Sequence, residues 1–115
     1  MNLKVECVNF LEDYYTKKEN LLINCQTHVF KNYNNREDIQ FFLDLLFVLF
    51  KDVLYASYGI PIAYQTYQSQ IESYECNQEK VIEILELILK TKEAIKSNAY
   101  LMLLMDSFVY EIQRR

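Results

Sequence analysis

Apolar residues recur every three or four positions along most of the chain, which is the spacing of one face of an α-helix. This pattern predicts five helices, over about residues 3–15, 20–32, 36–58, 77–97 and 99–113. A shorter, less buried helix is expected within 62–76, where the sequence is aromatic and polar. We therefore expect an all-α fold, a single compact bundle of about five helices over residues 1–115.

The predicted helix over 36–58 is apolar on nearly all sides. A helix of this kind is covered by neighbours on more than one face, so we expect it at the centre of the bundle. Asn34 or Asn35 is expected to cap its start, and Gly59 to end it. Asn77 is the expected cap of the helix that follows residue 76.

In the other helices the apolar stripe identifies the expected core. The inward residues are, helix by helix, Leu3, Cys7, Phe10, Leu11 and Tyr14; Leu22, Cys25, Val29 and Tyr33; Val81, Ile84, Leu85, Ile88 and Ile95; and Leu101, Met105, Phe108 and Ile112. Glu6, Glu12 and Asp13 are expected to point elsewhere.

Composition narrows the class of protein. Apolar residues make up 51% of the chain, which argues against disorder, and the net charge of −4 lacks the basic footprint of nucleic-acid binding. Three cysteines without CxxC spacing are typical of a reducing compartment. The longest apolar run, Leu45–Phe50, is far short of a membrane span, and no secretory signal is visible. We expect a cytoplasmic location and no membrane partner.

The sequence offers little for catalysis. With one glycine it contains no glycine-rich phosphate loop, and His28 is its only histidine, which excludes the usual metal motifs and triads. Asp44 and Asp52 lie eight residues apart on one helix, but isolated acids of this kind are usually caps or ion-pair partners. We expect no catalytic residue, metal ligand, cofactor or small-molecule ligand, and therefore no enzyme.

Two features remain open to more than one interpretation. The ten tyrosines, among them Tyr64, Tyr67 and Tyr74, fit either helix packing or a protein interface. Lys51 and Asp52 are adjacent in an apolar helix and therefore point about 100° apart. Since an unpaired buried charge is costly, we interpret each as one half of an interhelical tie rather than as a catalytic pair.

Residues 47–59, FVLFKDVLYASYG, resemble the helix RD-L-L-x-x-K-x-G in the C-terminal domain of the delta prime subunit of bacterial DNA polymerase III. In this resemblance Lys51 takes the place of the arginine and Asp52 that of the aspartate. Val53 and Leu54 take the two apolar places, and Gly59 matches the glycine. Ser57 stands where the family often has lysine.

Residues 84–112 are similar to the closing pattern of the same family, in which an apolar helix is followed by N-x-N-x-x-L-x-L-E-x-L-L. Tyr100 stands where the family has its second asparagine. The matching residues are Asn98 for the first asparagine, Leu103 and Met105 for the leucines, Asp106 for the glutamate, and Phe108 and Val109 for the final pair.

The resemblance implies a role in the clamp loader. Subunits of that machine carry an ATPase-like module, a lid and a helical C-terminal domain, and five such helical domains associate as a collar. The chain then corresponds to the collar domain without the ATPase-like module, with subunits of gamma/tau and delta type as partners and DNA reached only through the full complex. Lys51 and Asp52 become an architectural signature, and partner contacts are expected from tyrosines and aliphatic residues of 62–115.

Two other classes of function stay open from the sequence. One is a free-standing helical adaptor or regulatory protein unrelated to replication. The other is a small helical enzyme or metal carrier, which the lack of motifs disfavours.

Overall fold

Helices are the one type of regular secondary structure in the part of the chain that the structure describes. The computed structural model describes residues 2–97 and 100–115 and contains no strand within them. Its helices are, in chain order, α1 (Leu3–Thr16), the 3₁₀ helix η1 (Lys18–Asn20), α2 (Leu21–His28), α3 (Arg36–Ser57), the 3₁₀ helix η2 (Gln65–Tyr67), α4 (Gln68–Glu72), α5 (Gln78–Ala94) and α6 (Leu101–Gln113). The predicted all-α fold is confirmed.

Asparagine side chains determine where three of the helices begin. The Oδ1 atoms of Asn2, Asn35 and Asn77 each accept a hydrogen bond from the backbone N–H three residues later, at 2.9, 2.9 and 3.1 Å. The first N–H groups of a helix have no partner within it, so each cap satisfies one of them. The caps at Asn35 and Asn77 agree with the sequence analysis, whereas the cap at Asn2 was not predicted.

Gly59 ends α3 as the sequence predicts. Its φ is +72°, a backbone conformation that glycine adopts without steric cost. The Gly59 N–H bonds to the Ala56 carbonyl at 3.1 Å, and the Ile60 N–H bonds to the Tyr55 carbonyl at 3.0 Å. These are the two hydrogen bonds of a Schellman motif, and they terminate the helix while satisfying its last carbonyl groups.

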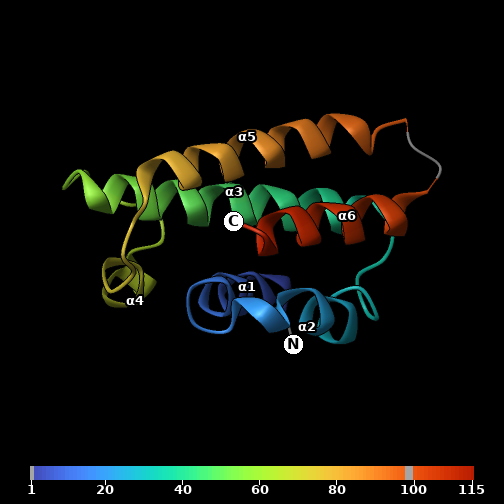
Figure 1. The fold of residues 1–115 in the computed structure, drawn as a ribbon, viewed down its shortest axis with the longest axis horizontal. Coiled ribbons are helices and arrows are strands. Elements are labelled where there is room, and N and C mark those ends of the chain that lie inside the picture. The colour runs from blue at the N-terminus through green and yellow to red at the C-terminus, as the bar shows by residue number, and fades with distance from the viewer. Residues whose placement is uncertain (1, 98–99) are drawn as a thin grey trace.

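The long helix α3 runs through the molecule and packs against α1, α4 and α5 (Figure 1). In this view α5 lies along one side of α3, and α1 and α2 lie on the other side. The C-terminal helix α6 returns to pack against both α5 and α2, although α2 lies far from it in the sequence. The molecule measures 41 × 26 × 24 Å along its principal axes.

One hydrophobic core draws on all the longer helices. The stripe predicted for α1 is confirmed, since its members are all buried: Leu3, Cys7, Phe10, Leu11 and Tyr14. In α5, α6 and the turn after α5, the predicted inward residues are buried as well, except for Leu85 and Leu101, which are half-buried. Phe42 of α3 makes edge-to-face contacts with Phe10 and Phe30 at centroid distances of 5.8 and 6.1 Å.

The second predicted helix is partly wrong. It starts at Leu21 rather than Asn20 and ends at His28 rather than Asn32, because residues 29–33 form a turn closed by a Tyr33 N–H to Val29 carbonyl bond of 2.8 Å. The sequence analysis placed Leu22 in the core, but Leu21 is the buried residue and Leu22 is only half-buried. The buried stripe is Leu21, Cys25 and Val29, spaced four residues apart, and the helix packs against α1 and α6.

Two further residues are placed differently from expectation. Glu6, expected to point away from the core, is only 4% exposed, because α2 packs beside α1. Phe41 of α3 is 54% exposed, so the apolar helix is not covered on every side.

The segment 62–76 is helical over a shorter stretch than predicted. It consists of η2, α4 and irregular chain, and within these two short helices Ile71 is the buried residue. Its polar residues turn to one another and to α1, as in the 2.5 Å hydrogen bond from the Tyr74 hydroxyl to Glu12. Asp52 of α3 supplies a second attachment.

Candidate functional site

Asp52 is the most enclosed charged residue of the first family-like motif. It lies in α3 with 0% of its surface exposed. Its Oδ1 accepts the backbone N–H of Ala63 and its Oδ2 accepts that of Tyr64, each at 2.9 Å. Hydrogen bonds between an ionised carboxylate and backbone N–H groups are among the stronger ones in proteins. Asp52 thus fastens the segment after Gly59 onto α3.

The expected interhelical ties are therefore corrected. Asp52 is tied to the backbone of a connecting segment rather than to a side chain of another helix. Lys51 is half-buried, and its Nζ lies 5.1 Å from the ring centroid of Tyr55, one turn further along the same helix. A lysine ammonium over an aromatic face is favourable without a carboxylate partner.

The two family-like motifs divide between core and surface and form no common site. Val53, Met105 and Phe108 are buried, while Leu54 and Asp106 are half-buried. Leu103 is 69% exposed. Asn98, the first asparagine of the second motif, lies outside the described residues. His28, the one histidine, is exposed at the end of α2.

The outward sides of α5 and α6 each carry two exposed apolar residues. On α5 these are Ile82 and Leu89, 42% and 52% exposed, which we call the α5 outer stripe. On α6 they are Leu103 and Tyr110, 69% and 50% exposed, which we call the α6 outer stripe. Residues seven apart lie nearly two helical turns along one side, so each pair faces one direction.

A shallow apolar hollow lies between these two helices. Its volume is about 190 Å³, and its walls are Leu87, Lys90, Thr91, Ala94, Leu104, Ser107, Phe108 and Glu111. Leu87 of α5 and Leu104 of α6 are half-buried and line this hollow. The apolar surface of α6 therefore extends from its exposed residues into the hollow.

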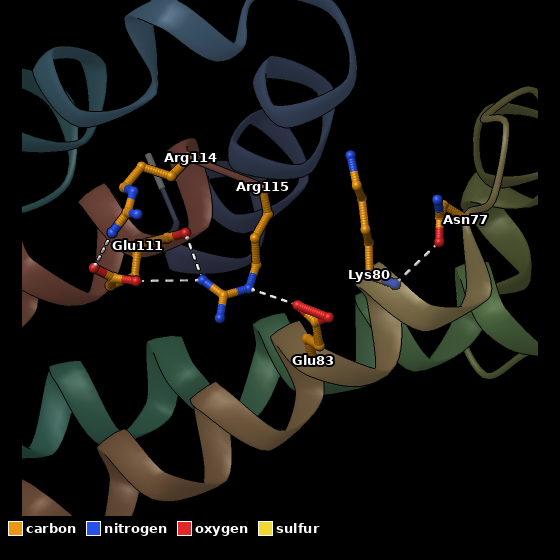
Figure 2. Close-up of polar contacts among 6 residues, drawn as sticks. All are labelled: Asn77, Lys80, Glu83, Glu111, Arg114 and Arg115. Carbon is orange, nitrogen blue, oxygen red and sulfur yellow. Dashed lines mark hydrogen bonds and ion pairs between the residues drawn. The ribbon is translucent and has the colours of Figure 1, made fainter.

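Charged residues tie the end of α6 to α5 (Figure 2). The Arg115 Nε lies 3.3 Å from a Glu83 carboxylate oxygen, and its Nη1 lies 3.4 Å from a carboxylate oxygen of Glu111. Arg114 pairs with the same Glu111 at 3.0 Å. Arg114 and Glu83 are more than half exposed, whereas Glu111 is 37% and Arg115 27% exposed. Ion pairs that remain accessible to water contribute at most about 1 kcal/mol each. The cluster orients the end of α6 and offers no unpaired charge for a substrate.

Another hollow, of about 750 Å³, lies where α3 ends, between residues 59–65, α4 and the start of α5. Its titratable lining residues are Glu72, Tyr74 and Cys76, without a histidine, lysine or arginine. Tyr74 is engaged with Gln70 and Glu12 through bonds of 2.7 and 2.5 Å. Glu72 accepts a hydrogen bond from Gln68 at 2.6 Å, and no hydrogen bond within the described residues joins it to Cys76.

Within residues 2–97 and 100–115, no three His, Cys, Asp or Glu side chains are placed to hold a metal ion. None of the described helices is both long and apolar enough to cross a lipid bilayer. Comparison with protein-family models, curated proteins and solved structures gives no match. A functional proposal therefore draws on the surfaces described above and on the resemblances noted in the sequence.

Sequence reasoning missed two features. The backbone partners of Asp52 could not be foreseen, because a hydrogen bond to a loop depends on where the loop returns. The burial of Glu6 had a weak signal, since it sits between the buried positions Leu3 and Cys7 at the edge of the α1 stripe.

Proposed function

We propose that this chain is a protein–protein assembly domain of a DNA polymerase III clamp loader, of delta prime type, acting in the collar. The assembly part of the proposal draws on the surface of the molecule. The clamp-loader part draws on the matches at residues 47–59 and 84–112 and on the all-α fold, which is the architecture that the resemblance implies.

The observation that carries the assembly role is the pair of outer stripes. Four large apolar side chains, two on each of α5 and α6, keep 42–69% of their surface in water. Burying apolar surface contributes roughly 25 cal/mol per Å², so a partner that covers these stripes gains appreciable free energy. Single exposed apolar residues are ordinary, but repetition at a seven-residue interval on two successive helices gives each helix a face suited to packing.

Exposed large apolar residues occur in both halves of the described chain. The exposed large apolar residues of residues 2–61 are Val5, Ile23, Phe41, Tyr58 and Ile60, and those of the described part of 62–115 are Ile82, Leu89, Tyr100, Leu103 and Tyr110. The C-terminal set is the one that forms stripes. Two stripes on different helices suit a subunit in a closed ring, which contacts two different neighbours through two different surfaces.

Co-elution with purified subunits separates the proposal from its alternative. The chain is mixed with the gamma/tau and delta subunits of its source organism and applied to a size-exclusion column. A clamp-loader collar domain migrates with them, and intact delta prime then displaces it. A free-standing adaptor elutes alone at every concentration while circular dichroism shows it folded.

A further inference from the structure

A polar pocket is lined by residues of α1, α2 and the turns beside them. These two helices lie on the other side of α3 from α5 (Figure 1). Its volume is about 480 Å³. Its apolar walls are Phe10, Leu21, Cys25 and Val29, and its polar lining residues are Glu6, Asn9, Glu12, Asp13, Lys17, Asn24 and His28. It is separate from the α5 and α6 outer stripes, and nothing in the proposed function uses it.

Glu6 is the unusual member of this lining. It is 4% exposed, yet its side chain forms no hydrogen bond or ion pair with any residue in 2–97 or 100–115. By contrast, the carboxylate of Asp52 accepts two backbone N–H groups. In the described part of the chain, the fully enclosed side-chain atoms without a hydrogen bond are the Tyr15 hydroxyl and Arg115 Nε. The oxygens of Glu6 are therefore open to the pocket rather than sealed in the core.

Other negative charges face the same space. One carboxylate oxygen of Asp13 accepts a hydrogen bond from the Asn24 side-chain amide at 3.1 Å, and the other oxygen accepts none from a described residue. Glu6, Asp13 and Cys25 all line the pocket. Burial raises the pKa of the Cys25 thiol, and the charges of Asp106, Glu6 and Asp13 raise it further.

The remaining charged groups of the pocket are Glu12 and Lys17. Glu12 is already engaged by the Tyr74 hydroxyl at 2.5 Å. Lys17 is exposed and forms no ion pair with a described residue, and His28 is exposed at the end of α2. Glu6 lies in the first turn of α1, where the helix dipole attracts a negative charge. That attraction is weaker than the stabilisation from a hydrogen-bonded partner.

We propose that this pocket receives an arginine side chain of a partner protein, with its guanidinium group on Glu6 and Asp13. A guanidinium donates several hydrogen bonds in a plane and pairs with carboxylates through two of them at once. The methylene stem of the arginine fits along apolar walls such as Leu21 and Val29. The volume exceeds that of a single metal ion, and the described carboxylates form no metal-binding group.

The test is a titration of the whole isotope-labelled chain, followed by NMR, with two capped tripeptides, Gly-Arg-Gly and Gly-citrulline-Gly. Citrulline has the shape of arginine without its charge. The arginine peptide is expected to shift the backbone signals of Asn24 and Cys25 and to bind at least about tenfold more tightly than the citrulline peptide. Equal binding of the two peptides, or no shift near the pocket, overturns the proposal.

Matched variants locate the site. Glu6→Gln keeps the size of the side chain and is expected to weaken arginine-peptide binding about tenfold, while Glu86→Gln on the exposed side of α5 leaves it unchanged. Because Glu6 has no partner to lose, Glu6→Gln is expected to unfold at the same or a higher denaturant concentration. Unchanged binding by a folded Glu6→Gln variant overturns the assignment.

The cation could also be a free polyamine, so spermidine is titrated under the same conditions. Weaker binding of spermidine than of the arginine peptide supports a partner side chain, because a polyamine lacks the planar guanidinium group that pairs with a carboxylate through two hydrogen bonds. Tighter binding of spermidine overturns the assignment to a partner protein. Both titrations use small probes, so their outcome does not depend on whether the chain joins a clamp loader.

Discussion

The Oδ2 atom of Asp52 accepts the backbone N–H of Tyr64 at 2.9 Å, across twelve positions of sequence. Asp52 has no exposed surface, and its other oxygen accepts the N–H of Ala63 at 2.9 Å. Gly59 makes this possible, because its left-handed backbone ends α3 and lets the chain double back along it. A single carboxylate therefore determines where the segment leading into α4 lies.

Replacing Asp52 tests this attachment. Asp52→Ala is expected to lower the free energy of unfolding by about 1–4 kcal/mol, because it leaves two backbone N–H groups without their acceptor. Asp44→Ala on the same helix is the control, since Asp44 is half-exposed and pairs with Lys92 at the surface, a contact of about 1 kcal/mol or less. Urea denaturation provides both values. An Asp52→Ala variant no less stable than the Asp44→Ala variant would contradict the role given to Asp52.

Gly59 provides a second test of the same turn. No atom lies within 4 Å of a Cβ placed on Gly59, so any cost of substitution comes from its φ of +72°. Gly59→Ala is expected to destabilise the fold by about 1–2 kcal/mol, and Gly59→Asn by less, because asparagine tolerates this conformation better. Thermal or urea denaturation gives the comparison. An alanine variant as stable as the parent would contradict the left-handed conformation assigned to Gly59.

The starts of α3 and α5 and the end of α3 were predictable because they depend on local chemistry. Asn35, Asn77 and Gly59 act on backbone groups within a few residues, and the α1 stripe follows from one face meeting the core. The burial of Leu21 and Glu6 depends instead on α2 lying between α1 and α6, a contact between distant parts of the chain. The sequence carries only a weak signal for Glu6, at the edge of the α1 stripe.

The candidate site was predictable to a smaller extent. The tie at Asp52 was expected from the cost of a buried charge, but its partner is a backbone whose position depends on the turn at Gly59. The outer stripes could be read only after the core-facing sides of α5 and α6 were known, since apolar residues such as Leu89 and Leu103 look like core residues in a sequence.

The three cysteines are expected to differ in reactivity. Cys7 and Cys25 are 0% and 2% exposed, and burial raises the pKa of each thiol, so little thiolate forms. Cys76 is half-buried. A thiol reagent is expected to modify Cys76 first in the native protein and all three cysteines after denaturation, as mass spectrometry can establish. Modification of Cys7 or Cys25 at the rate of Cys76 would contradict this packing.

Alkaline pH is expected to destabilise the fold through Tyr15 and Tyr74, whose rings stack at a centroid distance of 4.4 Å. Burial raises the pKa of both, and the bond to the Glu12 carboxylate raises that of Tyr74 further. In the unfolded chain these phenols lose their protons near pH 10, so above that pH the unfolded state binds fewer protons than the native state. Stability therefore falls as pH rises through this range.

Unfolding free energies measured between neutral pH and about pH 11 test this dependence. The fall is expected to be smaller in Tyr74→Phe, which has no phenol to ionise at that position. An identical fall in the variant and the parent would show that Tyr74 does not contribute.

The outer stripes connect the structure to the proposed assembly. Leu103→Glu and Leu89→Glu are expected to change the unfolding free energy by less than about 0.5 kcal/mol, because both side chains are more than half exposed. Each places a charge on a stripe that a partner would have to bury, so each should weaken association at its own interface. Gln26→Glu, an exposed change on α2, adds the same charge elsewhere and serves as control.

Sedimentation velocity of the chain mixed with the gamma/tau and delta subunits of its source organism tests the assembly role most directly. The parent chain and Gln26→Glu are expected to sediment with those subunits, while Leu103→Glu and Leu89→Glu, shown folded by circular dichroism, sediment more weakly with them or alone. If intact delta prime sediments with the subunits but the folded parent chain stays separate even at tens of micromolar, the chain is not the collar domain proposed here.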